Sequence, residues 1–133
     1  MIALDTNVLV RFVVEDDARQ TAAAAKLIDR AITDDQPLFV STIVLCEFVW
    51  VLSGSYRVSR PEIGHVLREL LRVRHLSFDT PDQLVRALDA FLHGKGDFAD
   101  YVIREHGRTA GCDTVATFDR ALLKERGYIA PGT

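Results

Sequence analysis

The sequence predicts an α/β protein, a three-layer α/β/α sandwich around a central, mostly parallel sheet of four or five strands. Short apolar runs alternate with longer amphipathic segments along the chain, as in strand and helix alternation. A helix between consecutive strands supplies the crossover that a parallel pair requires. With 133 residues, 48% hydrophobic and 26% charged, the chain has material for one ordinary domain. We therefore expect a single domain over residues 1–133.

The first half of the chain begins with a buried strand, because residues 2–4 are apolar and a polar turn follows them. Apolar residues recur at helical spacing over 18–34, with charged residues between them, which predicts an amphipathic helix. Ser41 provides a capping hydroxyl for a helix over about 42–54. A second short strand is expected over 38–40.

Capping patterns start the helices of the second half. Ser59 with Glu62 fits a capping box and predicts a helix to about residue 73, and Thr80 with Gln83 repeats the pattern for a helix to about residue 92. Another helix is expected over about 97–108. The remaining elements are expected to be strands over 76–78 and 114–118, a short helix over 120–126 and an edge strand at 128–129.

Composition excludes several classes of protein. No apolar run approaches the roughly 20 residues of a membrane helix, and the N-terminus does not resemble a signal peptide. We therefore expect a cytoplasmic protein, with Cys46 and Cys112 as buried free thiols.

The net charge of −3 becomes +1 when four carboxylates gathered in one site are set aside, so RNA is not excluded as a partner.

Two acidic residues directly follow predicted strands. Asp5 comes after the first strand and Asp119 after the strand that begins near residue 114. In open α/β sheets the ligand site lies at the carboxyl ends of the strands. Either aspartate is equally compatible with a simple capping role for the next helix. Together they indicate a candidate site at this edge.

Glu47 is the only charged residue between Val40 and Arg57, in a helix that is apolar almost all round. Such a helix is expected to be buried, and a buried carboxylate needs a compensating positive charge. That charge is either a metal ion or an arginine such as Arg11 or Arg104. The sequence alone leaves both interpretations open.

Asp97 and Asp100 lie three residues apart at the start of a predicted helix, so they share one face near its positive end. Asp97 fits the N-cap position, and Asp100, inside the first turn, is the better ligand candidate. Converging carboxylates repel one another unless a divalent ion neutralises them, and oxygen ligands favour Mg²⁺ or Mn²⁺. The four histidines are scattered, and no zinc-type cluster, phosphate loop or dinucleotide fingerprint is present.

The order of these motifs resembles a PIN domain, and most closely the VapC ribonuclease toxins of bacterial type II toxin-antitoxin pairs. The motifs are Leu4 to Arg11 at the N-terminus, Glu47 in an apolar helix, Asp97 to Asp100 opening a late helix and Thr117 to Asp119 after a late strand. The resemblance covers essentially the whole chain. It implies a PIN-like fold and a metal-dependent endoribonuclease that hydrolyses RNA phosphodiester bonds.

The resemblance also implies roles for individual residues. The acidic quartet of the family, which binds Mg²⁺ or Mn²⁺, is matched by Asp5, Glu47, Asp100 and Asp119. Asp5, Asp100 and Asp119 are the expected metal ligands, and Glu47 or Asp100 is expected to orient the attacking water. The flanking polar residues expected to support this site are Thr6, Asn7, Asp97 and Thr117.

The partners implied by the resemblance are an RNA substrate and a cognate antitoxin protein, in a heteromeric complex built on a homodimer, without a membrane. Candidates for contacts with RNA phosphate are Arg11, Lys95, Arg104 and Arg108. Two other functions remain as alternatives. One is a receiver-like or phosphatase domain that forms an aspartyl-phosphate. The other is a catalytically silent PIN-fold module that uses its acidic cleft to bind a basic peptide.

Overall fold

Three parallel strands form the sheet of the N-terminal unit in the computed structural model of the chain, which describes residues 1–132. Their spatial order is β1-β2-β3, with Ile2 beside Leu38 and Leu38 beside Leu76 in register. Because the strands are parallel, the residues that follow them begin their loops at the same edge of the sheet. The strands are β1 (Ile2–Ala3), β2 (Leu38–Val40) and β3 (Leu76–Phe78).

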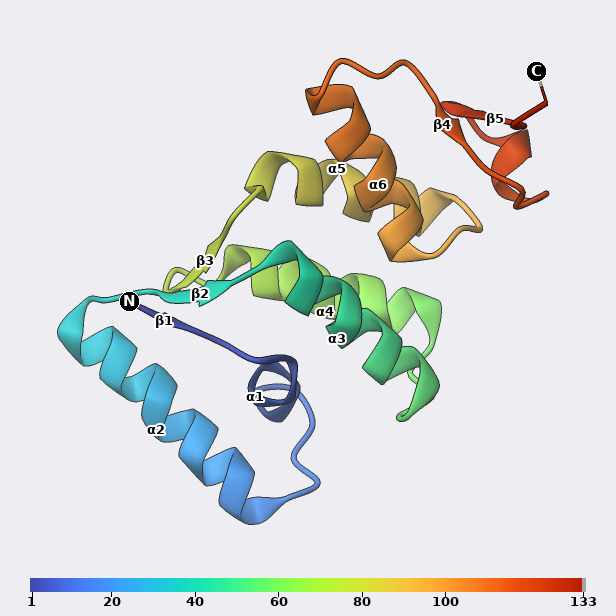
Figure 1. The fold of residues 1–133 in the computed structure, drawn as a ribbon. Helices are drawn as coiled ribbons and strands as arrows, with labels where there is room; N and C mark the ends of the chain where they lie inside the picture. Colours follow the sequence, from blue (N-terminus) through green and yellow to red (C-terminus); the bar gives the residue numbers. More distant parts are fainter. Residues whose placement is uncertain (133) are drawn as a thin grey trace. The chain divides into compact units, whose positions relative to one another are not determined.

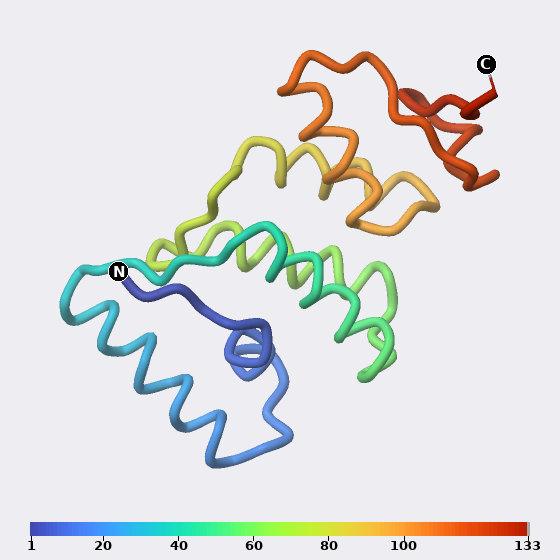
Figure 2. The backbone as a smooth tube through the Cα atoms, in the orientation of Figure 1, coloured from blue at the N-terminus to red at the C-terminus, as the bar shows by residue number. Residues whose placement is uncertain are grey.

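The N-terminal unit, unit 1, covers residues 1–80 and contains four helices besides this sheet (Figures 1 and 2). The helix α1 packs against both α2 and α3, and α3 packs against α4. Leu9, Phe48 and Leu67, from three of these helices, are fully buried. The four helices are α1 (Thr6–Arg11), α2 (Ala18–Asp34), α3 (Thr42–Gly54) and α4 (Arg60–Arg72).

The second unit, unit 2, begins at Pro81 and is built on a pair of packed helices. The rings of Phe91 and Phe98 meet edge to face, with their centroids 6.0 Å apart. Tyr101 is fully buried. The elements of unit 2 are α5 (Pro81–His93), α6 (Phe98–Thr109), β4 (Val115–Ala116), the 3-10 helix η1 (Leu122–Lys124) and β5 (Tyr128–Ile129).

The expected sheet of four or five strands is wrong for residues 1–132. Five strands form, but they make one sheet of three and a separate parallel pair, β4 with β5. The strand β4 has only two residues. The amides of Val115 and Thr117 donate hydrogen bonds to the carbonyls of Gly127 and Ile129, at 2.8 and 2.9 Å. These ladder donors are therefore already used within unit 2. The three-layer arrangement and the single domain over residues 1–133 stay predictions.

Most of the helices and strands lie within two residues of their expected positions. The largest differences are the expected helix over 120–126, of which only Leu122–Lys124 is helical, as a 3-10 helix, and the expected strand over 114–118, of which only two residues are strand. Neither cysteine is in a disulfide, but neither is fully buried as expected: Cys46 is half-buried, and Cys112 is exposed, since its loop follows the last turn of α6. Within residues 1–132, none of the helices combines the length and the apolar character that spanning a membrane demands.

Candidate functional site: acidic residues of both units

Asp5 directly follows the first strand and is the N-cap of α1. Its Oδ1 atom accepts a hydrogen bond from the amide of Thr6 at 2.7 Å. Its other oxygen has no hydrogen-bond partner within residues 1–132, and the residue is exposed, as is Asn7. Thr6 is 7% exposed, and its hydroxyl oxygen is buried without a partner in the described part of the chain. Asp5 can therefore hold the helix start with one oxygen and bind a cation with the other.

Glu47 lies on α3, the helix that packs against α1 in the same unit. The sequence predicts burial for this residue, and the structure corrects that expectation, because Glu47 is exposed. The buried face of α3 is formed by other positions, including Leu45, Phe48 and Leu52. Ile43 and Trp50, four residues before and three after Glu47, are exposed on its side of the helix at 72% and 52%. An apolar helix is thus buried along only one face.

Both arginines that could have paired with Glu47 have acidic partners within their own units. Arg11 forms an ion pair with Asp16, and Arg104 pairs with Glu105 at 3.2 Å. Among residues 1–132, Glu47 has no ion-pair partner. The expected salt bridge to Arg11, which lies in the same unit, is therefore wrong, and the Glu47 carboxylate has no cation from unit 1.

Arg11 belongs to a polar network of its own in unit 1. Its guanidinium donates to Gln20 Oε1 at 2.6 Å and to the hydroxyl of Tyr56 at 3.2 Å, besides pairing with Asp16. The Tyr56 hydroxyl in turn donates to Asp16 at 2.8 Å. The hydrogen bond to Tyr56 raises the pKa of the Arg11 guanidinium above its ordinary value. These contacts engage the side chain that we expected to be a phosphate contact.

Asp97 and Asp100 together cap the start of α6. The Asp97 carboxylate accepts from the amide of Phe98 at 2.8 Å, and Asp100 Oδ2 accepts from the amide of Asp97 at 2.9 Å. This arrangement is a reciprocal capping box, and it confirms Asp97 as the N-cap. The Oδ1 atom of Asp100 has no hydrogen-bond partner within residues 1–132.

Asp119 organises the chain after β4 in a similar way. Its Oδ1 atom accepts from the amides of Ala121 and Leu122 at 2.8 and 3.1 Å. Its own amide donates to the hydroxyl of Thr117 at 3.1 Å, which gives Thr117 a positioning role. Asp119 is exposed, and its second oxygen has no hydrogen-bond partner among the described residues.

The acidic residues of unit 2 act on one another electrostatically. Burial raises the pKa of the Asp100 carboxyl above its ordinary value, and the hydrogen bond from the Asp97 amide opposes this shift. The negative charges of Asp97, Asp119 and Glu125 raise the same pKa further. Like charges within reach of one carboxylate favour a cation beside it. In unit 2 the charges of Asp97, Asp119 and Glu125 thus act on Asp100, although these side chains do not form a metal-binding cluster within residues 1–132.

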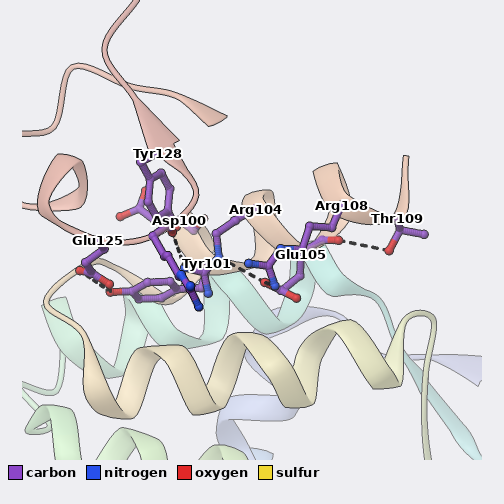
Figure 3. A network of polar contacts seen from close by, with 9 residues as sticks. Asp100, Tyr101, Arg104, Glu105, Arg108, Thr109, Glu125 and Tyr128 are labelled. Atoms are coloured by element: carbon purple, nitrogen blue, oxygen red, sulfur yellow. Dashed lines mark hydrogen bonds and ion pairs between the residues drawn. The ribbon is translucent and has the colours of Figure 1, made fainter. Parts of the chain in front are cut away.

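Glu125 was not predicted as part of the site, because its position between Lys124 and Arg126 is typical of a surface residue. Figure 3 shows it beside the ring of Tyr101. The buried Tyr101 hydroxyl donates to the Glu125 carboxylate at 2.9 and 3.0 Å and accepts from the amide of Gly96 at 2.8 Å. The amide of Lys95 also donates to Glu125, at 3.2 Å. Glu125 thus fixes the loop that leads into Asp97.

Asp79 was also missed, although the signal for it was the one used for Asp5. It directly follows β3, at the edge of the sheet where the loop after β1 also starts. Its carboxylate accepts from the amide of Thr42 at 3.3 Å and from the hydroxyl of the same residue. Asp79 therefore holds the start of α3, the helix that carries Glu47.

The described residues do not bring three metal-ligating side chains together. Within residues 1–132, no group of three or more His, Cys, Asp or Glu is placed to hold a metal ion. The donor set nevertheless fits a hard divalent cation, since every candidate is a carboxylate. Asp5, Asp100 and Asp119 each use one oxygen to accept a backbone amide and keep the second for a ligand.

Comparison with models of known protein families gives a match over most of the chain. Residues 2–126 match the family described as the PIN domain, a span that includes all four acids of the predicted quartet. No curated protein matches the chain.

Proposed function

Since the chain belongs to the PIN domain family, whose members are generally nucleases, we propose that it is a metal-dependent endoribonuclease that hydrolyses RNA phosphodiester bonds. We propose further that it acts as the toxin of a bacterial toxin-antitoxin pair. The observation that carries the nuclease proposal is the group of aspartates that bind backbone amides through one oxygen only. The family match weighs against an aspartyl-phosphate mechanism, which has no further support in the described residues.

The residues proposed to hold Mg²⁺ or Mn²⁺ are Asp5, Asp100 and Asp119. When bound, such an ion supplies Lewis acidity that lowers the pKa of water and stabilises negative charge on the scissile phosphate. The backbone hydrogen bonds of these aspartates hold their carboxylates in fixed orientations, so little ordering is required when a ligand binds. Glu47, exposed and without an ion-pair partner in residues 1–132, is proposed to accept the proton of the attacking water.

The test is cleavage of a labelled single-stranded RNA. We expect the protein to cut the RNA in the presence of Mg²⁺ or Mn²⁺, and a chelator to stop the reaction. Asp5→Asn is expected to abolish cleavage, whereas Asp29→Asn, a matched change at an exposed position on α2, is expected to retain it. Intact RNA after incubation of the metal-loaded protein with several RNA sequences would overturn the proposal.

We also propose a homodimer that is neutralised in a heteromeric complex with an antitoxin protein. The support is the resemblance to VapC toxins in motif order. The expected observations are a dimeric mass by light scattering and a neighbouring reading frame that encodes a small protein with a basic tail. Loss of RNA cleavage when that protein is added at a stoichiometric amount would support the pairing, and unchanged cleavage would contradict it.

A further inference from the structure

A cavity of about 730 Å³ lies entirely within unit 2, and its lining carries an excess of positive charge. Its volume falls in the range of pockets that bind small ligands, roughly 300–1,000 Å³. Segments far apart in the sequence contribute to it: the end of α5, the loop before α6, α6 itself and the chain around η1. Its charged lining residues are Asp89, Lys95, Arg104, Lys124, Glu125 and Arg126.

The charge of this cavity differs from that of the unit around it. Unit 2 has eight acidic and seven basic side chains, and four of the seven basic ones line this one cavity. The two acidic side chains in the lining, Asp89 and Glu125, leave an excess of two positive charges. Glu125 is also held in place, because it accepts from the Tyr101 hydroxyl and the Lys95 amide. The cavity is therefore a local positive region in an acidic protein.

One of the four cations, Arg104, is held rigidly. Its guanidinium lies over the rings of Tyr101 and Tyr128, at 5.3 and 5.5 Å from their centroids. It also donates to the carbonyl of Arg126 at 3.0 Å and pairs with Glu105. A Cβ atom at Gly127 would lie 2.8 Å from the Cδ atom of Arg104, so the backbone there closes directly onto this side chain. Arg104 is thus a rigidly positioned part of the lining of the cavity.

The other three cations are free to bind a ligand. Lys95, Lys124 and Arg126 are exposed, and none of their side chains forms an ion pair with another residue of the described chain. By contrast, Arg108 pairs with the buried Glu105 at 3.3 Å. Lys95 is therefore the only one of our four predicted phosphate contacts whose side chain has no ion-pair or ring contact within residues 1–132.

The cavity adjoins one of the acids proposed to bind metal. Tyr128, on whose ring Arg104 lies, donates its hydroxyl proton to the carbonyl of Asp100 at 3.0 Å. Figure 3 shows Asp100, Arg104, Glu125 and Tyr128 in this arrangement. Asp100 itself is not part of the lining, but Tyr128 connects it to Arg104, which is.

We propose that this cavity binds the phosphodiester backbone of the RNA substrate, with Lys95, Lys124 and Arg126 contacting phosphates beside the scissile bond. The proposal rests on the proposed ribonuclease function. Lysine and arginine side chains supply most of the affinity of proteins for nucleic-acid backbones, and they do so without reading base sequence. Guanidinium groups of this kind also match phosphate oxygens in pairs.

The test measures RNA binding in the absence of divalent metal, so that hydrolysis does not enter. A fluorescein-labelled single-stranded RNA is titrated with the full-length protein by fluorescence anisotropy at several salt concentrations. The test variant is Lys124→Ala/Arg126→Ala. The matched control is Lys26→Ala/Arg30→Ala, which removes one lysine and one arginine from exposed positions on α2.

For single strands, each phosphate contact contributes about 0.7 to the slope of log affinity against log salt. The test variant is therefore expected to lower the slope by about 1.4, so that wild type loses about sevenfold more affinity than the variant between 50 and 200 mM salt. The control is expected to keep the wild-type slope. An unchanged slope in the test variant, equal slope losses in both variants, or no RNA binding by wild type would each overturn the proposal.

This outcome is separate from the fate of the nuclease proposal. Wild-type protein that binds RNA with the expected slope change and leaves it intact with Mg²⁺ or Mn²⁺ would refute the enzyme and support the cavity. If the wild-type protein cuts RNA but the salt slope of the Lys124→Ala/Arg126→Ala variant is unchanged, the nuclease proposal is supported and the cavity proposal is refuted. A DNA strand of the same sequence, bound with the same slope loss, would support backbone recognition, and binding restricted to RNA would add a contribution from the 2′-hydroxyl.

Discussion

The hydroxyl of Tyr101 donates a hydrogen bond to the carboxylate of Glu125, and the same hydroxyl accepts one from the amide of Gly96. Three segments of unit 2 meet at this one oxygen atom: the loop before α6, the first turns of α6 and the chain after η1. The contact therefore supports the placement of Asp97 and Asp100, which lie between Gly96 and Tyr101 in the sequence.

Tyr101→Phe should lower the free energy of unfolding. The variant keeps the buried ring but removes the hydrogen bonds of its hydroxyl with the Gly96 amide and with Glu125, and a hydrogen bond contributes about 0.5–1.5 kcal/mol. Urea denaturation measures the change. Glu125→Gln, which keeps an acceptor oxygen for the hydroxyl, is expected to cost less. Equal losses in the two variants would contradict this account.

Gly94→Ala should destabilise the protein by about 1–3 kcal/mol, because an added methyl group there must displace its neighbours. A Cβ atom at this position would lie 2.0 Å from the Tyr101 hydroxyl oxygen and 2.6 Å from Glu125 Oε1. At Gly54, in α3, a Cβ atom has no neighbour within 4 Å, so Gly54→Ala is the control and is expected to be neutral or stabilising. Thermal melts of the two variants in parallel decide the matter.

Asp5→Asn should remove RNA cleavage without lowering the melting temperature in the absence of metal. Asparagine is as good an N-cap as aspartate, so the hydrogen bond from Thr6 can be kept. Asp5→Ala, which cannot accept that hydrogen bond, is expected to cost about 0.5–2 kcal/mol. A large drop in melting temperature for Asp5→Asn would mean that the charge itself stabilises the fold.

Asp100→Asn should stabilise the metal-free protein at neutral pH and change little at low pH. Burial, followed by the charges of Asp97, Asp119 and Glu125, raises the pKa of the Asp100 carboxyl in the folded state. A raised pKa means that folding favours the protonated form of the Asp100 carboxyl. The contribution of this group to stability is therefore complete below about pH 4 and is lost as pH rises through the higher pKa of the folded state. The difference in melting temperature between variant and wild type should widen over that window. A gap that is constant with pH would contradict the electrostatic explanation.

Tyr128 should ionise at a higher pH in the folded protein than a tyrosine in an unfolded chain. Burial raises the pKa of Tyr128 to about 12, although the positive charge of Arg104 opposes the shift. Its contribution to stability is therefore complete below about pH 10 and lost between there and about pH 12. The difference in absorbance at alkaline pH between wild type and Tyr128→Phe reports this ionisation. A difference curve with its midpoint near the ordinary tyrosine pKa would refute the prediction.

The sequence predicted local structure well, because capping signals act over a few residues. Ser41 and Ser59 begin helices as expected, through hydrogen bonds from the amides of Val44 and Glu62. The predicted helix over 18–34 is α2, with the same bounds. The pairing of β4 with β5 was not predictable in this way, because the choice of a strand's neighbour depends on contacts distant in the sequence.

The candidate site was predictable in its residue types and less so in its surroundings. Asp97 as a cap followed from its position, whereas the exposure of Glu47 did not, because helical periodicity cannot say which face of an all-apolar helix is covered. Glu125 carries no distinguishing local pattern, because its role arises from a hydrogen bond with Tyr101, which only the folded chain brings near. Glu105 pairs with Arg104 and Arg108 on its own helix, whereas its burial depends on the folded chain.

The aspartates at 5, 97 and 119 each accept a backbone amide, and asparagine could do the same with its carbonyl oxygen. The backbone amides at these positions need a hydrogen-bond acceptor, and the acceptor need not carry a negative charge. In a library selected only for folded protein, both residue types should therefore survive at these positions. If catalysis depends on the ionised group, selection for RNA cleavage should recover aspartate alone at positions 5 and 119.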